Sequence, residues 1–244
     1  MPTLTRSASS TLLLILSLLM VPAIVGQAVE CPPGCSQGRW TNDAVDLSTE
    51  PSREPEKSRD IVISAPDHRK VARILNDHWW IEDSGKKIVA KDPLLYYPAE
   101  FAWAPDSSAF FITTSPGYTT GYEIYIYRIV QGKIISIGGI NRKVRIAFEH
   151  RHRCFDGDTG NDPNIVGLKW LKGSEQILVV AEVPPLGICS QADYFGGYEI
   201  SLSSGRILRR FSPEELAVGW SQVLGESLVG DLKQLSPKAK STLP

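Results

Sequence analysis

Internal repetition constrains this chain more than any single motif does. Three passages, over 64–89, 103–135 and 170–208, each contain a turn, a strand, a second strand, a glycine turn and a third strand. Repetition of such a β-meander is typical of folds that stack similar units and bury a continuous core between neighbours. The sequence therefore predicts a mainly β architecture of repeated antiparallel meanders, and such a scaffold alone does not name a function.

Short turn motifs separate the expected strands. Pro66-Asp67 and Pro105-Asp106 are turn dipeptides, because proline fixes φ and the aspartate side chain can accept a hydrogen bond from the backbone two residues on. Ser84-Gly85, Gln131-Gly132 and Ser204-Gly205 lie between apolar runs, which indicates hairpins.

Alternating hydrophobicity predicts several of the strands. Tyr122–Tyr127 alternates with period two, and 177–183 is nearly all apolar, as expected for a strand covered on both faces. Val144, Ile146 and Phe148 alternate with polar or small residues, so the same rule predicts a further half-buried strand there.

The chain closes with a helical pattern. Ser212 is a capping residue, Pro213 suits the first helical turn, and Glu215 can complete a capping box. Apolar residues continue at helical spacing. We therefore expect a C-terminal helical segment over 212–236 and a tail over 237–244.

The amino terminus predicts a secretory signal peptide over residues 1–28. Arg6 supplies the positive charge, Leu12–Met20 the apolar core, and Ala28 a small residue for cleavage. The alternative is a membrane anchor, but the apolar stretch is shorter than the ~20 residues that a spanning helix needs. We expect a secreted or periplasmic protein, with an extended or disordered lead segment over 29–60 and the β-repeat domain over 61–211.

The cysteine count fits this destination. An even number of cysteines in an exported chain predicts disulfides, here among Cys31, Cys35, Cys154 and Cys189. Pairing of Cys31 with Cys35 and of Cys154 with Cys189 is favoured, while the other pairings stay open. Metal or redox chemistry is the alternative, although Cys-x3-Cys is not the redox spacing.

Charge and composition exclude some partners. The formal net charge is −1, so no strongly basic surface is expected to attract nucleic acid. The rest of the chain contains no second long apolar run, so no membrane span is expected once the signal is cleaved.

The run from Trp103 to Ile112, which reads WAPDSSAFFI, resembles the signature of the WD40-like (PD40) repeats in TolB-type β-propellers. The resemblance covers 61–211 at most: the first unit has Ser64 in place of the tryptophan, and the third keeps Trp170 without the Pro-Asp turn. It implies three propeller-like antiparallel β-meander repeats. Closed propellers usually have four to eight blades, so a propeller fragment, an irregular stack of sheets and half of a closed dimer all stay open.

One segment could bind a divalent metal ion. Two histidines that would point the same way on a strand precede an acidic, glycine-bearing loop, and the candidate ligands are His150, His152, Asp156, Asp158 and Asp162. The plainer interpretation is a solvated strand face followed by an ordinary turn. No other cofactor is expected, and no hydrolase, zincin or phosphate-loop signature occurs.

These features favour a non-catalytic binding or scaffold protein with a protein partner in the envelope or outside the cell. Aromatic residues in and beside the long loops suit such an interface, namely Tyr118, Tyr122, Tyr194, Phe195 and Tyr198. Equally, these rings can cap the sheet instead. The main alternative is a secreted metal-dependent hydrolase that uses His150, His152 and the 156–162 loop. A third is an open-edged module completed by a partner strand, in a homo-oligomer or a hetero-complex.

Overall fold

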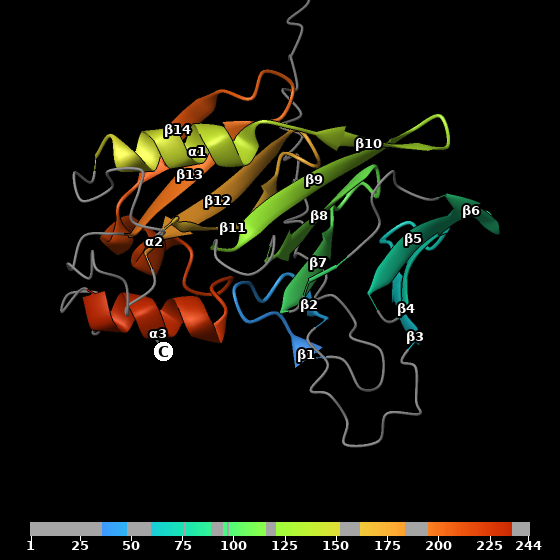
Figure 1. Ribbon diagram of the computed structural model, residues 1–244, viewed down its shortest axis with the longest axis horizontal. Coiled ribbons are helices and arrows are strands. Elements are labelled where there is room, and N and C mark those ends of the chain that lie inside the picture. Colours follow the sequence, from blue (N-terminus) through green and yellow to red (C-terminus); the bar gives the residue numbers. More distant parts are fainter. Residues whose placement is uncertain are drawn as a thin grey trace, which may run out of the picture.

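The computed structural model describes residues 36–47, 60–75, 77–88, 95–96, 98–115, 121–151, 162–183 and 195–235. Within them the protein is mainly β, as predicted, with three antiparallel sheets and three helices. Figure 1 shows the sheets side by side in chain order, with the C-terminal helices beyond the third sheet. The sheets of this described part close into neither a barrel nor a propeller.

Each sheet contains a four-stranded meander in chain order. The first sheet contains β3 (Asp60–Ser64), β4 (Lys70–Leu75), β5 (His78–Asp83) and β6 (Lys86–Ile88). The second contains β7 (Ala99–Trp103), β8 (Ala109–Thr114), β9 (Glu123–Val130) and β10 (Lys133–Ile137), and its β7 edge is extended by β2 (Val45–Asp46) and β1 (Ser36–Gln37). The third contains β11 (Asn164–Leu171), β12 (Gln176–Glu182), β13 (Phe195–Ser201) and β14 (Ile207–Phe211).

The predicted hairpin turns are confirmed at equivalent places in the sheets. Ser84-Gly85 joins β5 to β6 and Gln131-Gly132 joins β9 to β10, and all four residues have positive φ. In the third sheet Gly205, with φ 61°, lies between β13 and β14. Positive φ at both central residues gives a backbone twist that matches the twist of the flanking strands, and glycine adopts it without steric cost.

Two tryptophans join neighbouring sheets by the same contact. Trp103 Nε1 donates a hydrogen bond to the Ile63 carbonyl at 3.1 Å, and Trp170 Nε1 donates one to the Ala102 carbonyl at 3.3 Å. Trp103 is the last residue of β7 and Trp170 the last but one of β11, so each lies just before the first turn of its sheet. Each acceptor lies one residue before the equivalent position of the preceding sheet. The first sheet has Ser64 there, and no described sheet precedes it.

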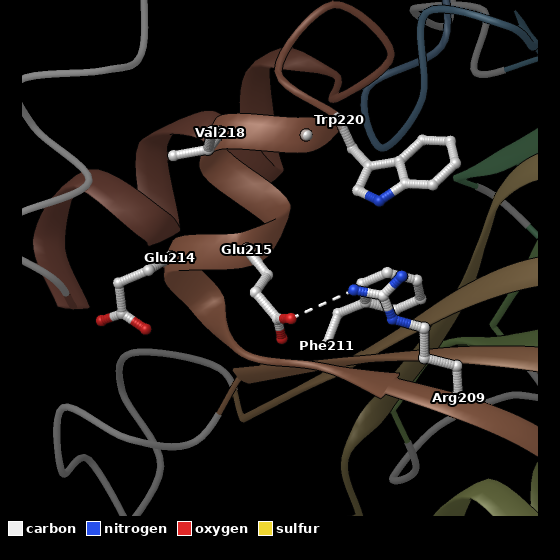
Figure 2. A pocket seen from close by; sticks show the side chains of 7 residues that line it. Arg209, Phe211, Glu214, Glu215, Val218 and Trp220 are labelled. Atoms are coloured by element: carbon white, nitrogen blue, oxygen red, sulfur yellow. Dashed lines mark hydrogen bonds and ion pairs between the residues drawn. The ribbon is translucent and has the colours of Figure 1, made fainter.

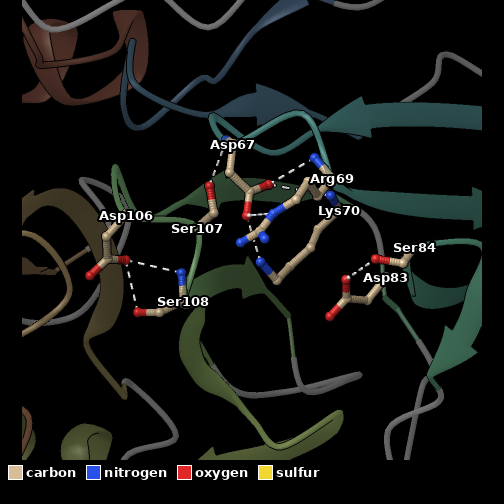
Figure 3. A network of polar contacts seen from close by, with 8 residues as sticks. All are labelled: Asp67, Arg69, Lys70, Asp83, Ser84, Asp106, Ser107 and Ser108. Carbon is tan, nitrogen blue, oxygen red and sulfur yellow. Dashed lines mark hydrogen bonds and ion pairs between the residues drawn. The ribbon is translucent and has the colours of Figure 1, made fainter.

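The first turns of the sheets also interlock, as Figure 3 shows for the first two. The Asp67 N–H donates to Ser107 Oγ at 2.8 Å, and Ser174 Oγ donates to Asp106 Oδ2 at 2.7 Å. Both predicted Pro-Asp turns have the expected geometry, because Oδ1 of each aspartate accepts from the N–H two residues on, at 3.0 Å. Burial acts to raise the pKa of Asp106, but hydrogen bonds from Ser108 and Ser174 hold it below its usual value.

The predicted strand over Val144–Phe148 is wrong. This segment is α1 (Ile140–Glu149), in which Ile140, Val144, Ala147 and Phe148 are buried and Ile146 is 54 % exposed. Buried positions four, three and one residues apart follow the helical period, so the apparent alternation came from three apolar residues only. α1 covers the face of the third sheet that also packs against the second sheet.

The opposite face of the third sheet is covered by the helices expected in the C-terminal segment. These are α2 (Pro213–Gly219), which begins with a capping box from Ser212, and α3 (Glu226–Leu235). Their apolar residues pack on Val166, Leu168, Leu178 and Val180. Between the helices, a Cβ on Gly225 would lie 2.4 Å from the Arg39 carbonyl oxygen, so glycine is needed where this segment meets the N-terminal one. No helix in the described ranges is long and apolar enough to span a bilayer.

Candidate functional site

Many of the predicted site residues lie outside the described residues. All four cysteines, Tyr118, Tyr194, His152, Asp156 and Asp158 belong to this group. The predicted disulfides therefore stay predictions, and so does most of the predicted metal site.

The two described metal candidates have other roles. His150 is the exposed residue that ends α1, and its N–H donates to the Ile146 carbonyl. Asp162 forms an ion pair with Arg145 at 3.5 Å, and Arg145 also pairs with Glu123 at 3.1 Å. Among the residues that the structure describes, no three acidic, histidine or cysteine side chains gather as metal ligands would.

The described aromatic candidates pack inside the protein. Phe195 is 2 % exposed and Tyr198 is 3 % exposed, and burial raises the pKa of Tyr198 to about 12. Tyr122 is half-buried and its ring lies 4.4 Å from that of Trp40. The expectation that these two side chains are exposed to a partner is thus corrected: Phe195 packs in the core cluster shared with the C-terminal helices, and Tyr198 in the cluster shared with α1 and the second sheet.

A groove lies instead between β14 and α2 (Figure 2), with a volume of about 500 Å³. The rings of Phe211 and Trp220 stand nearly perpendicular, at 85°, with centroids 6.0 Å apart. Figure 2 shows the Trp220 ring on one side of the space and, on the other, the Phe211 ring with the Arg209 guanidinium over it. The lining is mostly apolar and consists of Arg209, Phe211, Glu214, Glu215, Val218, Gly219 and Trp220.

The charged groups in the groove hold one another in place. The Arg209 guanidinium lies 4.4 Å from the Phe211 ring centroid and donates to Glu215 Oε1 at 3.2 Å. Glu215 Oε2 accepts from the Ser212 N–H at 2.8 Å, which completes the capping box of α2. These bonds, the one from Ser212 first, lower the pKa of Glu215. The arginine therefore lies over the Phe211 ring and pairs with the first turn of α2.

Two buried carboxyl groups lie away from this groove. Glu182, at the end of β12, is 3 % exposed and accepts from Asn164 Nδ2 at 3.2 Å. Burial, and after it the neighbouring Asp231 carboxylate of α3, raise the pKa of Glu182 to about 8, and burial also raises that of Asp231. Glu182 therefore keeps its proton at neutral pH, and the pair joins α3 to the sheet.

Glu100 in β7 is the second of these groups. It is fully buried and accepts from the Trp40 N–H at 2.6 Å, and burial raises its pKa to about 8. The hydrogen bond attaches the N-terminal segment to the second sheet. Neither Glu100 nor Glu182 lines the groove.

Sequence reasoning did not single out the groove. Trp220 is one of the apolar residues at helical spacing after Ser212, and Arg209 and Phe211 lie just after the third repeat at 170–208. The available signal was local: adjacent arginines in a short strand directly before a strong capping box. That pattern places cations and an aromatic residue at a strand–helix junction, but it does not show that the junction is hollow.

No protein-family profile matches this chain, and a search of the curated proteins finds no related sequence.

Proposed function

We propose that this protein is an exported, non-catalytic binding or scaffold module of propeller-like type, which acts in the periplasm or outside the cell on a protein partner. The observation that carries the proposal is the groove between β14 and α2, an apolar and aromatic hollow with a fixed arginine on the last sheet of the array. Concave sites of this kind, with few and well-held polar groups, suit recognition.

The way in which the sheets are joined supports a scaffold. Trp103 and Trp170 make equivalent contacts to the preceding sheet, and the turns of successive sheets bond to one another. Such regular docking resembles repeat architectures, in which each unit contacts only its neighbours. A binding surface on a rigid scaffold loses little conformational entropy when it is occupied.

The composition of the groove favours binding over catalysis. Arg209 and Glu215 bond to one another, and Glu215 also accepts from the cap of α2, so both side chains hold the strand–helix junction together. The metal-dependent hydrolase that would use His150, His152 and the 156–162 loop stays an alternative, and most of these residues lie outside the described ranges. No observation on the described residues favours it.

An affinity capture with paired variants tests the proposal. The tagged protein from Val29 onward is exposed to envelope extract and culture fluid of its source, beside Trp220→Ala and the control Trp80→Ala. Trp80 is also a partly exposed tryptophan, but it lies on the first sheet. Truncation of an aromatic anchor in an interface costs 2 kcal/mol or more, so Trp220→Ala should reduce recovery of a specific partner at least about tenfold.

Circular dichroism first establishes that both variants are folded. Equal recovery by wild type and Trp220→Ala, or loss with Trp80→Ala alone, would contradict a groove-based binding function. Metal-dependent hydrolytic activity that is lost in a His152→Ala variant would replace the proposal with the hydrolase.

A further inference from the structure

β14 is the terminal strand of the third sheet. In the part of the chain that the structure describes, it pairs with β13 on one side and with no strand on the other. Leu208, Arg209 and Arg210 within it are all exposed. The outward N–H and C=O groups of such an edge strand are available to an added strand.

Among the described residues at this edge the cations outnumber the carboxylates only slightly: Arg206, Arg209, Arg210 and Lys143 against Glu199, which lies opposite Arg209, and Glu214 and Glu215 of the groove. Arg209 is neutralised by Glu215, whereas Arg206 and Arg210 form no ion pair with the described carboxylates. Lys143 of α1 adds a further cation, because its Nζ lies 3.5 Å from a carbonyl in the turn between β13 and β14. An extended chain that approaches this edge therefore meets a local field that favours carboxylates.

The two faces of the edge differ in chemistry. Arg209 and Phe211 line the groove, so this side of β14 faces α2. Arg210 lies between them in sequence and points to the other side of the sheet, as alternate residues of a strand do. Val218, on the outer surface of α2 beside the groove, is 70 % exposed. An added strand would thus place one set of side chains over the groove and the other set beside Arg210, which forms no ion pair with a carboxylate of the described residues.

We propose that β14 binds an extended segment of another protein by strand addition, with apolar side chains in the groove and carboxylates on the Arg210 side. The inference rests on the proposed binding function and specifies the partner as an acidic segment that alternates with apolar residues. A second copy of this chain fits the edge poorly. Pairing two β14 strands would bring their adjacent arginines together, and like charges on neighbouring strands are destabilising.

The test uses two synthetic peptides and the full mature chain. One capped peptide alternates valine with glutamate over about eight residues, the length of a typical strand, and the other has lysine in place of each glutamate. Fluorescence anisotropy of the labelled peptides measures binding to wild type, Arg210→Glu and the control Arg69→Glu. Arg69 is an exposed arginine in a turn of the first sheet, with 74 % of its side chain accessible.

The glutamate peptide should bind wild type and Arg69→Glu with equal affinity, and at least about tenfold more weakly to Arg210→Glu. The lysine peptide should show the reverse preference for Arg210→Glu. Binding of the glutamate peptide should also leave β14 amides protected from hydrogen exchange, because an added strand accepts from them.

Equal binding of both peptides, no loss in Arg210→Glu, or unprotected β14 amides would overturn strand addition. These outcomes are distinct from failure of the proposed function. A partner whose capture depends on Trp220, together with no affinity for the glutamate peptide, would keep the groove as a binding site and remove the acidic extended segment as its occupant.

Discussion

The two end sheets of the protein differ in how they meet their surroundings. The outer face of the first sheet carries polar groups: Arg73 pairs with Glu82 at 2.9 Å, and Lys87 lies 4.1 Å above the Trp80 ring. The corresponding face of the third sheet is apolar and lies under α2 and α3, with Leu228 and Leu232 fully buried. The two ends of a stack of sheets need a polar outer face or a cover of other elements. In this protein the first sheet has the polar face and the third sheet has the helical cover.

The difference teaches where a partner can be accommodated. Along β4 and β5 buried residues alternate with more exposed ones, so one face of the first sheet is packed and the other is suited to water. The third sheet instead needs a cover, and the cover leaves a groove where α2 crosses β14. The N-terminal segment completes the cover, since Thr41 Oγ1 donates to the Leu168 carbonyl at 2.6 Å.

Two matched leucine truncations should show the largest effect. Leu228→Ala removes a side chain from the core between α3 and the third sheet and should lower the free energy of unfolding by about 2–5 kcal/mol. Leu75→Ala, on the first sheet where the residue is 36 % exposed, should cost less than about 1 kcal/mol. Urea denaturation measures both, and equal losses would mean that α3 is no real part of the core.

Replacement of the buried carboxyl group of Glu182 should have the next largest effect on stability. The pKa of Glu182 is about 8 in the folded protein and 4.5 for the ordinary group, so between these values the folded state holds the extra proton. The free energy of unfolding therefore falls as pH rises through this range. Glu182→Gln should match wild type near pH 4 and exceed it by about 1–3 kcal/mol at pH 8. Parallel pH curves of the two proteins would contradict the buried pair.

Asp67 in the first sheet is a control, because its effect on stability changes with pH in the opposite direction to that of Glu182. Burial acts to raise the pKa of Asp67, but its bonds with Lys70 and Arg69 hold it below its usual value. Its contribution to stability is present at neutral pH and is lost as pH falls through that lowered value. Asp67→Asn should thus be less stable than wild type at pH 7 and equal to it in strong acid.

Removal of the tryptophan hydrogen bond should destabilise the protein equally at the two junctions between sheets. Trp103→Phe and Trp170→Phe each remove an Nε1–H donor to the preceding sheet while they keep a large ring. Each should lower the free energy of unfolding by about 1–2 kcal/mol, because a buried carbonyl loses its donor. Thermal unfolding compares the two, and a loss at only one junction would show that the contacts are not equivalent.

The smallest effect is expected on the solvated face. Lys87→Ala removes the ammonium above Trp80 and should cost no more than about 0.5–1 kcal/mol. High salt should reduce this difference, as for other exposed charges. A larger loss would indicate that the outer face of the first sheet is covered in the folded protein, as the third sheet is, and would contradict the difference between the two sheets.

Local chemistry explains what could be predicted from the sequence. The Pro-Asp turns, the glycine hairpins and the Ser212 capping box depend on a few adjacent residues, and all of them are present. The strand before each first turn was not recognised as part of the same sheet. Its partner lies across that turn, so each three-stranded unit of the sequence is a four-stranded sheet in the structure.

The features that the sequence did not predict depend on contacts between elements that are distant in the sequence. The period-two spacing of Val144, Ile146 and Phe148 predicts a strand, whereas the burial of Ala147 and the exposure of Ile146 follow the helical period of α1. Aromatic residues beside a long loop suit an interface, but α1 and the C-terminal helices bury Phe195 and Tyr198 on the two faces of the third sheet. The groove needs β14 and α2 to meet at a particular angle, which no local pattern encodes.

Hydrogen exchange of the mature protein, with and without a captured partner, tests the central claim most directly. If the third sheet and its helical cover form the binding surface, amides of 207–220 should become protected, while those of β4, β5 and β6 stay unchanged. Protection that falls on the outer face of the first sheet, with 207–220 unaffected, would contradict the account.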